Sequence, residues 1–116
     1  MSIRAISLIV AEPSQVADRL AGAFGWTVSQ DYGAFAEVTT GSLLLWLNEP
    51  SEPTTEVQQG VIVHEFVDDV SAAAERARSA GAAILREPTV MDFGLESAWA
   101  RVDGGPIIDL NLKVAG

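Results

Sequence analysis

Residues 6–14 read ISLIVAEPS, and residues 63–71 read VHEFVDDVS. Both stretches begin with a short apolar run and pass through an acidic turn into a segment with helical spacing, so that Val10 corresponds to Val67. Such self-similarity is the signature of a supersecondary unit that occurs more than once in a chain. We therefore expect two copies of one unit, with a site where the copies face each other.

The spacing of apolar residues indicates the elements of the first unit. We predict a strand over residues 3–10, a helix that begins at Pro13 and ends at Gly25, and strands over residues 26–31, 34–39 and 42–48. One face of the first strand is apolar, and the other face, which includes Ser7, lines a less apolar space. The last of these strands is apolar on both faces, and we expect it to be buried.

The second unit repeats this order of elements. We predict a helix over residues 71–79, strands over residues 62–67, 83–86, 97–102 and 107–112, and a long loop over residues 87–96. Residues 50–60 contain two prolines and have no apolar period, which indicates a linker. The chain is thus expected to be one domain, residues 1–116, with unit one at 1–49, the linker at 50–60 and unit two at 61–116.

Composition and charge exclude several classes of protein. A chain of 116 residues fits one domain, and a hydrophobic content of 48% argues against disorder. No apolar run is long enough to cross a bilayer and the first residues lack a signal-peptide pattern, so we expect a cytoplasmic protein with no membrane partner. The absence of cysteine excludes disulfides and thiolate metal sites. A net charge of −9 disfavours nucleic acid as a partner, and it suits a cationic ligand or solubility alone.

Several short motifs resemble those of a known family. They are residues 32–37 (YGAFAE), 41–47 (GSLLLWL), 67–70 (VDDV), 81–82 (GA) and 102–110 (VDGGPIIDL). Their order within two β-α-β-β-β units resembles the vicinal oxygen chelate superfamily, which includes glyoxalase I, extradiol dioxygenases, fosfomycin-resistance transferases and bleomycin-binding proteins. The resemblance covers the whole chain and is closest to the metal-free antibiotic-binding resistance proteins.

This resemblance implies an architecture and an assembly. The fold class would be α+β, with two repeated β-α-β-β-β units that form curved, mixed or mostly antiparallel sheets around a cavity. The helices would cover the outer faces of the sheets. The chain would be a homodimer, because small members of the superfamily commonly pair or exchange units to complete each cavity.

In the metal-dependent members, the first and last strands of each unit supply the metal ligands. The resemblance assigns these positions to Ala5, Ile62, Leu44 or Leu45, and Asp109. Alanine, leucine and isoleucine offer no donor atom to a divalent ion, which needs several nitrogen or oxygen ligands. His64 is the one histidine of the chain. We therefore expect no metal and no other cofactor.

The candidate ligand-binding residues are Ser7, Phe35, Trp46, His64, Phe93, Trp99 and Asp109. Trp46 faces the cavity in the register of the family, and it packs beneath the helices if the strand is slipped by one residue. His64 is either a donor in the pocket or a satisfied strand histidine. Asp109 is either a pocket carboxylate or the ion-pair partner of Arg101 or Arg86. As an aromatic residue on a loop, Phe93 is a candidate lid or dimer contact.

Two classes of function are consistent with these residues. The chain is predicted to be a small-molecule-binding protein of the antibiotic-resistance type, which sequesters an aromatic or cationic drug-like compound without a metal. The alternative is a glyoxalase-, dioxygenase- or transferase-like enzyme of the same superfamily, which requires a metal, or a metal-free enzyme with His64 and Asp109 as an acid–base pair. The serines lack a nucleophile-elbow sequence, and we assign no catalytic residue.

Overall fold

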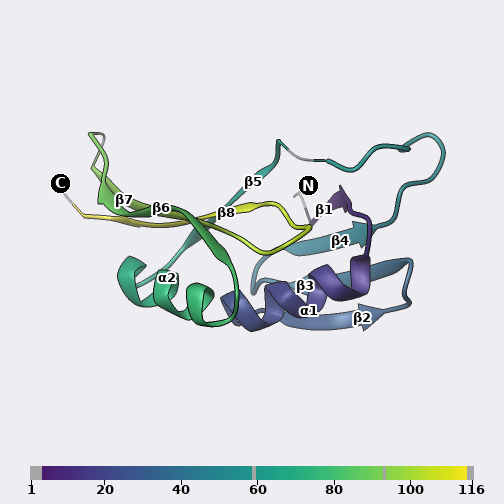
Figure 1. Cartoon of the computed structure of the whole chain (residues 1–116), viewed down its shortest axis with the longest axis horizontal. Helices are drawn as coiled ribbons and strands as arrows, with labels where there is room; N and C mark the ends of the chain where they lie inside the picture. The colour runs from purple at the N-terminus through teal and green to yellow at the C-terminus, as the bar shows by residue number, and fades with distance from the viewer. Residues whose placement is uncertain (1–3, 59, 93, 115–116) are drawn as a thin grey trace.

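The computed structural model describes residues 4–58, 60–92 and 94–114, and it contains two units built in the same way. The first unit consists of β1 (Ala5–Ile9), α1 (Pro13–Phe24), β2 (Thr27–Asp31), β3 (Phe35–Thr39) and β4 (Leu44–Asn48). The second consists of β5 (Ile62–Phe66), α2 (Val70–Ser79), β6 (Ala83–Val90), β7 (Leu95–Arg101) and β8 (Ile107–Lys113). The two units lie side by side along the longest axis of the molecule (Figure 1).

Each unit forms its own four-stranded mixed sheet. The strand orders are β1-β4-β3-β2 and β5-β8-β7-β6. In both sheets the first strand pairs in parallel with the last, and the remaining pairs are antiparallel. The matching order and direction of the strands confirm the predicted α+β fold with two repeated β-α-β-β-β units.

The helices begin and end where local chemistry favours it. Pro13 is the first residue of α1, where its missing N–H costs nothing, and Gly25 ends the helix with a φ of 73° that an L side chain rarely adopts. The carboxylate of Asp69 caps α2 by accepting a hydrogen bond from the Ala72 amide at 2.9 Å. No helix within the described residues is both long and apolar enough to cross a membrane.

One face of each sheet packs against the helices, and the other face is open. In the first sheet Ala36, Val38, Leu45 and Leu47 are fully buried beneath α1. The equivalent buried residues of the second sheet are Ala98, Ala100, Ile108 and Leu110. Because side chains alternate along a strand, the residues between these positions point to the open faces. Both open faces lie on the side away from the helices (Figure 1).

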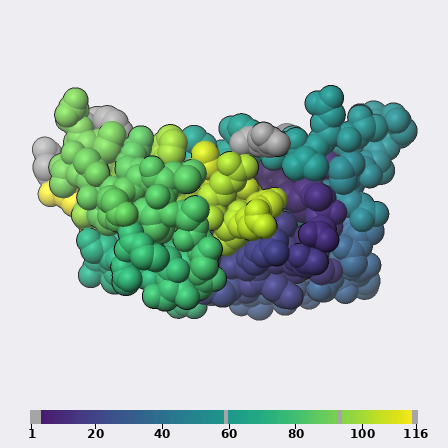
Figure 2. All heavy atoms as spheres, in the orientation of Figure 1, coloured from purple at the N-terminus to yellow at the C-terminus, as the bar shows by residue number. Residues whose placement is uncertain are grey.

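The two units meet through their helices and through the turn between β7 and β8. Helices α1 and α2 contact each other, and Arg19 of α1 donates a hydrogen bond to the Asp103 carbonyl at 3.1 Å. Figure 2 shows this turn, in yellow-green, against the purple and blue atoms of the first unit. Among the residues that the structure describes, the strands of one sheet make no contact with those of the other.

The predicted loop over residues 87–96 is shorter than expected. Strand β6 continues to Val90 and β7 begins at Leu95, with Thr89 paired to Ser97. A proline normally disfavours a strand, but β6 is an edge strand, where the missing N–H of Pro88 costs little. The pairing also shifts between Arg86 and Thr89, around the proline.

Candidate functional site

The open face of the second sheet carries a row of polar and aromatic side chains. The strand register places Arg86, Trp99, Asp109 and His64 side by side across the sheet. The next row contains Ser97, Asn111 and Phe66. Four strands therefore bring together residues that are far apart in the sequence.

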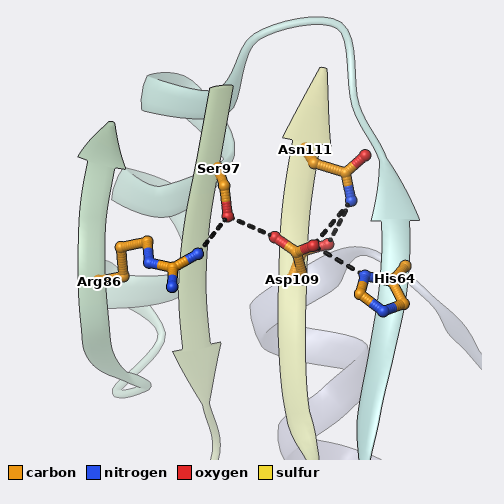
Figure 3. A network of polar contacts seen from close by, with 5 residues as sticks. All are labelled: His64, Arg86, Ser97, Asp109 and Asn111. Carbon is orange, nitrogen blue, oxygen red and sulfur yellow. Dashed lines mark hydrogen bonds and ion pairs between the residues drawn. The ribbon is translucent and has the colours of Figure 1, made fainter. Parts of the chain in front are cut away.

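A chain of hydrogen bonds connects five of these side chains (Figure 3). Arg86 Nη1 donates to Ser97 Oγ at 3.1 Å, and Ser97 Oγ donates to Asp109 Oδ1 at 2.7 Å. His64 Nδ1 lies 2.8 Å from Asp109 Oδ2. Since a carboxylate only accepts, the shared proton belongs on Nδ1, which makes Nε2 the acceptor of the neutral ring.

Asp109 lies inside this network and is largely shielded from solvent. Only 7% of the residue is exposed, and its two oxygens accept hydrogen bonds from three side chains. Neither of the two arginines considered from the sequence binds it directly. Arg86 reaches it through Ser97, and Arg101 donates instead to the Gly105 carbonyl at 3.1 Å.

Asn111 belongs to the same network, although it was not among the predicted site residues. Its Nδ2 donates to the carbonyl oxygen of Asp109 at 3.1 Å and to Asp109 Oδ2 at 3.2 Å. Asn111 is 2% exposed, and among the described residues its Oδ1 has no hydrogen-bond partner. The signal was present in the sequence, because Asn111 stands two positions after Asp109 in an apolar strand and so shares its face.

These side chains line a cavity of about 360 Å³. The guanidinium carbon of Arg86 lies 4.1 Å from the centroid of the Trp99 ring, in cation–π contact. The full lining consists of His64, Phe66, Arg86, Met91, Leu95, Ser97, Trp99, Asp109 and Asn111. Phe66, which the sequence prediction missed, is 78% exposed. Three of the predicted residues, His64, Trp99 and Asp109, thus come together in one pocket.

Three other predicted residues lie on the open face of the first sheet. Ser7 is paired in register with Trp46, and Phe35 lies near Trp46 with a centroid distance of 6.4 Å. Trp46 Nε1 donates to Glu37 Oε2 at 2.8 Å. The hydrogen bond from Trp46, which has the larger effect, and a hydrogen bond from Ser29 lower the pKa of Glu37. The remaining predicted residue, Phe93, lies outside the described residues.

The strand register also resolves the four positions that the resemblance implied for metal ligands. Ala5 is paired with Leu44 on the open face, whereas Leu45 is buried under the helix. Asp109 is thus the one position of the four with a donor atom. In the described part of the chain, no group of three or more His, Cys, Asp or Glu side chains is arranged to hold a metal ion. This donor set does not fit a catalytic divalent metal.

Comparisons with known proteins agree with this architecture. Residues 2–98 match the model of the Glyoxalase/Bleomycin resistance protein/Dioxygenase superfamily. A solved structure described as a conserved domain protein is similar, with 29% identity, a TM-score of 0.83 and coverage of 96% of this chain and 97% of that one. TioX from Micromonospora sp. ML1 has 22% identity and a TM-score of 0.77 over 98% of this chain and 100% of its own.

A superfamily protein from Nocardioides has 15% identity and a TM-score of 0.82, with coverage of 100% of this chain and 85% of that one. At these last two identities the likeness shows the fold alone. A search of curated proteins found no match to the sequence. The family match extends over most of the chain, and the repeated units are those that its structural relatives share. The chain therefore belongs to the glyoxalase/bleomycin resistance protein/dioxygenase superfamily.

Proposed function

We propose that this protein binds a planar, aromatic small molecule in the pocket of the second sheet, as a sequestering protein of the antibiotic-resistance type. One observation carries the proposal, which is the pocket itself. A cavity of about 360 Å³ combines the aromatic surfaces of Trp99 and Phe66 with a few fixed polar groups. Small-molecule sites usually have this size and this mixture of apolar walls and convergent polar side chains.

The proposed binding does not use a metal ion. Asp109 is the only residue with an oxygen donor at the positions that supply metal ligands in metal-dependent members of the superfamily. Its oxygens already accept hydrogen bonds from Ser97, His64 and Asn111. Recruiting Asp109 to a metal would break these hydrogen bonds without supplying the other ligands that a divalent ion needs.

We also propose that the functional form is a homodimer in which two copies cover each other's open faces. Phe66, on the open face of the second sheet, is 78% exposed. Tyr32, in the turn between β2 and β3, is 73% exposed and stacks on Phe35 with a centroid distance of 6.3 Å. Large exposed aromatic side chains on a small protein favour an interface. In this arrangement Phe35 and Trp46 of one copy cover the pocket of the other.

Titration calorimetry with a panel of aromatic compounds tests the binding proposal. Trp99→Ala should weaken a ligand that stacks on this ring by about tenfold or more, given stacking energies of about 1–3 kcal/mol for bases on aromatic side chains. The matched variant Trp99→Phe keeps a stacking surface and should lose less. EDTA should leave the affinity unchanged. If no aromatic compound binds, or if EDTA abolishes binding, the proposal is wrong.

A second candidate function is metal-free acid–base catalysis. The observation that favours it is the 2.8 Å contact between His64 and Asp109, together with the 63% exposure of the His64 side chain. A carboxylate that orients a histidine prepares its Nε2 to accept a proton from a bound molecule. Mass spectrometry of a ligand recovered after long incubation separates the two functions. An unchanged ligand supports sequestration, whereas conversion that His64→Gln abolishes supports catalysis.

A further inference from the structure

We infer that the pocket selects planar aromatic anions, with Arg86 as the group that binds the negative charge. The inference rests on the proposed function and names the chemical class of its ligand. It differs from what the acidic sequence suggests, because a net charge of −9 favours a cationic ligand. The charged groups inside the pocket, and not the net charge of the chain, determine whether the preferred ligand is an anion or a cation.

The carboxylate of Asp109, which is the negative group of the pocket, already accepts hydrogen bonds within the protein. Asp109 is 7% exposed and accepts hydrogen bonds from Ser97, His64 and Asn111. A cationic ligand would have to displace one of these donors to reach a carboxylate oxygen. A buried carboxylate that already has its hydrogen bonds gains little from such an exchange.

The guanidinium group of Arg86, in contrast, has N–H donors available for a ligand. Arg86 uses one N–H for Ser97 and rests on the face of Trp99, 4.1 Å from the ring centroid. It forms no ion pair with any of the described carboxylates, whereas Arg78 on the outer face binds both Glu75 and Glu87. The guanidinium is a rigid, planar fork that can bind a carboxylate through two hydrogen bonds.

The fixed position of Arg86 makes it a suitable recognition group. Ser97 holds one nitrogen, and the Trp99 ring holds the plane of the guanidinium. A planar ligand that lies on the pocket wall can therefore place its carboxylate at a preset site, with little ordering cost for the side chain. Charges elsewhere on the surface are screened beyond about 8–10 Å at physiological salt.

Asn111 adds another buried polar side chain to the wall of the pocket. Its Nδ2 is directed at Asp109, which leaves the buried Oδ1 as an acceptor without a partner in the described residues (Figure 3). Asn111 lines the same cavity as Arg86. A buried acceptor without a donor costs free energy, and a ligand or a water molecule that supplies one removes this cost.

Three isosteric probes test which ligand charge the pocket prefers: 2-naphthoate, 2-naphthamide and 2-naphthamidinium. Calorimetry at physiological ionic strength should rank the anion at least tenfold tighter than the neutral amide, and the cation weakest, because a hydrogen bond to a charged group contributes about 1.5–3 kcal/mol. Arg86→Gln should abolish the preference for the anion. Arg78→Gln makes the same change of charge on the outer face and should leave the ranking intact.

Each outcome separates this inference from the proposed function. If the three probes bind equally, or the cation binds most tightly, the anion site is wrong while the binding function stands. If none of them binds and the wider aromatic panel also fails, both are wrong. Should Arg86→Gln fail to fold, the ranking of the probes on the unmodified protein still decides, because that comparison changes only the ligand.

Discussion

Asp109 accepts hydrogen bonds from three side chains at the centre of the second sheet, and this changes its role. The sequence left it open whether the residue is a ligand anchor or an ion-pair partner. In the structure it is bonded to His64 directly and to Arg86 through Ser97. Its contribution is therefore expected first in stability and only indirectly in binding.

Replacing this carboxylate should destabilise the protein. In Asp109→Asn, the new amide NH₂ must face at least one of the groups that now donate a hydrogen bond to the carboxylate. We expect a loss of about 1–3 kcal/mol in the free energy of unfolding, measured by urea denaturation. Asp18→Asn, on the exposed side of α1, is the control and should change little. Equal stabilities for the two variants would contradict the structural role of Asp109.

The candidate site could be predicted in part because strand periodicity assigns residues to faces. Periodicity gave the face of His64, whereas Asp109 was identified through the resemblance to the family and Trp99 through its small neighbours. The three residues share the pocket. Phe66 and Asn111 were missed although each stands two positions after a predicted site residue and so shares its face. What the sequence does not show is that Phe66 is exposed and Asn111 is buried. The distribution of site residues over two separate open faces depends on how the units pack, and periodicity along a strand contains no information about this.

At the scale of elements, the turn between β7 and β8 packs against α1 of the first unit and has little free space. A Cβ atom at Gly105 would lie 2.8 Å from Val102 Cγ2 and 3.5 Å from Val16 Cγ1 of α1. Val102 and Val16 are both buried. Neither neighbour is the free end of a flexible chain, so the turn has no room for a side chain at this position.

Two glycine-to-alanine substitutions should therefore act in opposite directions. Gly105→Ala overpacks the junction and should destabilise the protein by about 1–3 kcal/mol. Gly22→Ala lies within α1 with nothing within 4 Å of the new methyl group, and it should stabilise by about 0.4–1 kcal/mol. Thermal unfolding of both variants measures the contrast. A neutral Gly105→Ala would mean that Val102 and the turn can shift without cost.

Strand β5 carries a second junction residue, Glu65, which is sensitive to pH. Burial raises the pKa of Glu65 above its ordinary value, and a hydrogen bond from Trp26 in the first unit opposes the rise. A carboxyl group with a raised pKa in the folded state favours folding when it is protonated. Its contribution to the free energy of unfolding therefore decreases as the pH rises from its ordinary pKa to the raised pKa of the folded state.

Glu65→Gln removes this dependence while it keeps an acceptor for Trp26. The variant should melt at a higher temperature than the unmodified protein at pH 7, and the difference should shrink toward pH 4. Glu56→Gln in the exposed linker is the control and should show no such trend. A difference that grows on acidification would contradict the assigned direction of the pKa shift.

The bounds of the elements show which local signals are reliable. Pro13 and Gly25 identified the two ends of α1, because one residue lacks the N–H and the other tolerates a positive φ. The predicted loop at 87–96 was too long, since β6 continues through Pro88 to Val90. The tolerance of Pro88 depends on β6 being an edge strand, and that is a property of the whole sheet.

At the scale of the whole molecule, the internal repeat made the fold predictable. Two stretches with the same pattern implied the same unit twice, and the two sheets have the same order and directions. The sequence could not show that the units meet through their helices. That arrangement depends on shape complementarity at α1, α2 and the turn that contains Gly105.

The exposed aromatic residues give a prediction for the assembly. Light scattering at micromolar concentration should give a mass about twice that of the 12.3 kDa chain, because the exposed aromatic side chains of Phe66 and Tyr32 favour pairing. Phe66→Ser should shift the mass toward that of one chain without unfolding it. A single-chain mass for the unmodified protein at all concentrations would refute the homodimer.

The separation of the two sheets has a consequence for biosynthesis. All pairings of the first sheet lie within residues 5–48, so a ribosome that adds about 5–20 residues per second exposes a complete first unit before it has finished the second. During this interval, the side of α1 that will later meet the turn at Gly105 has no partner. A chaperone that follows the nascent chain would therefore be expected to bind this helix, while the strands of the first unit are already paired.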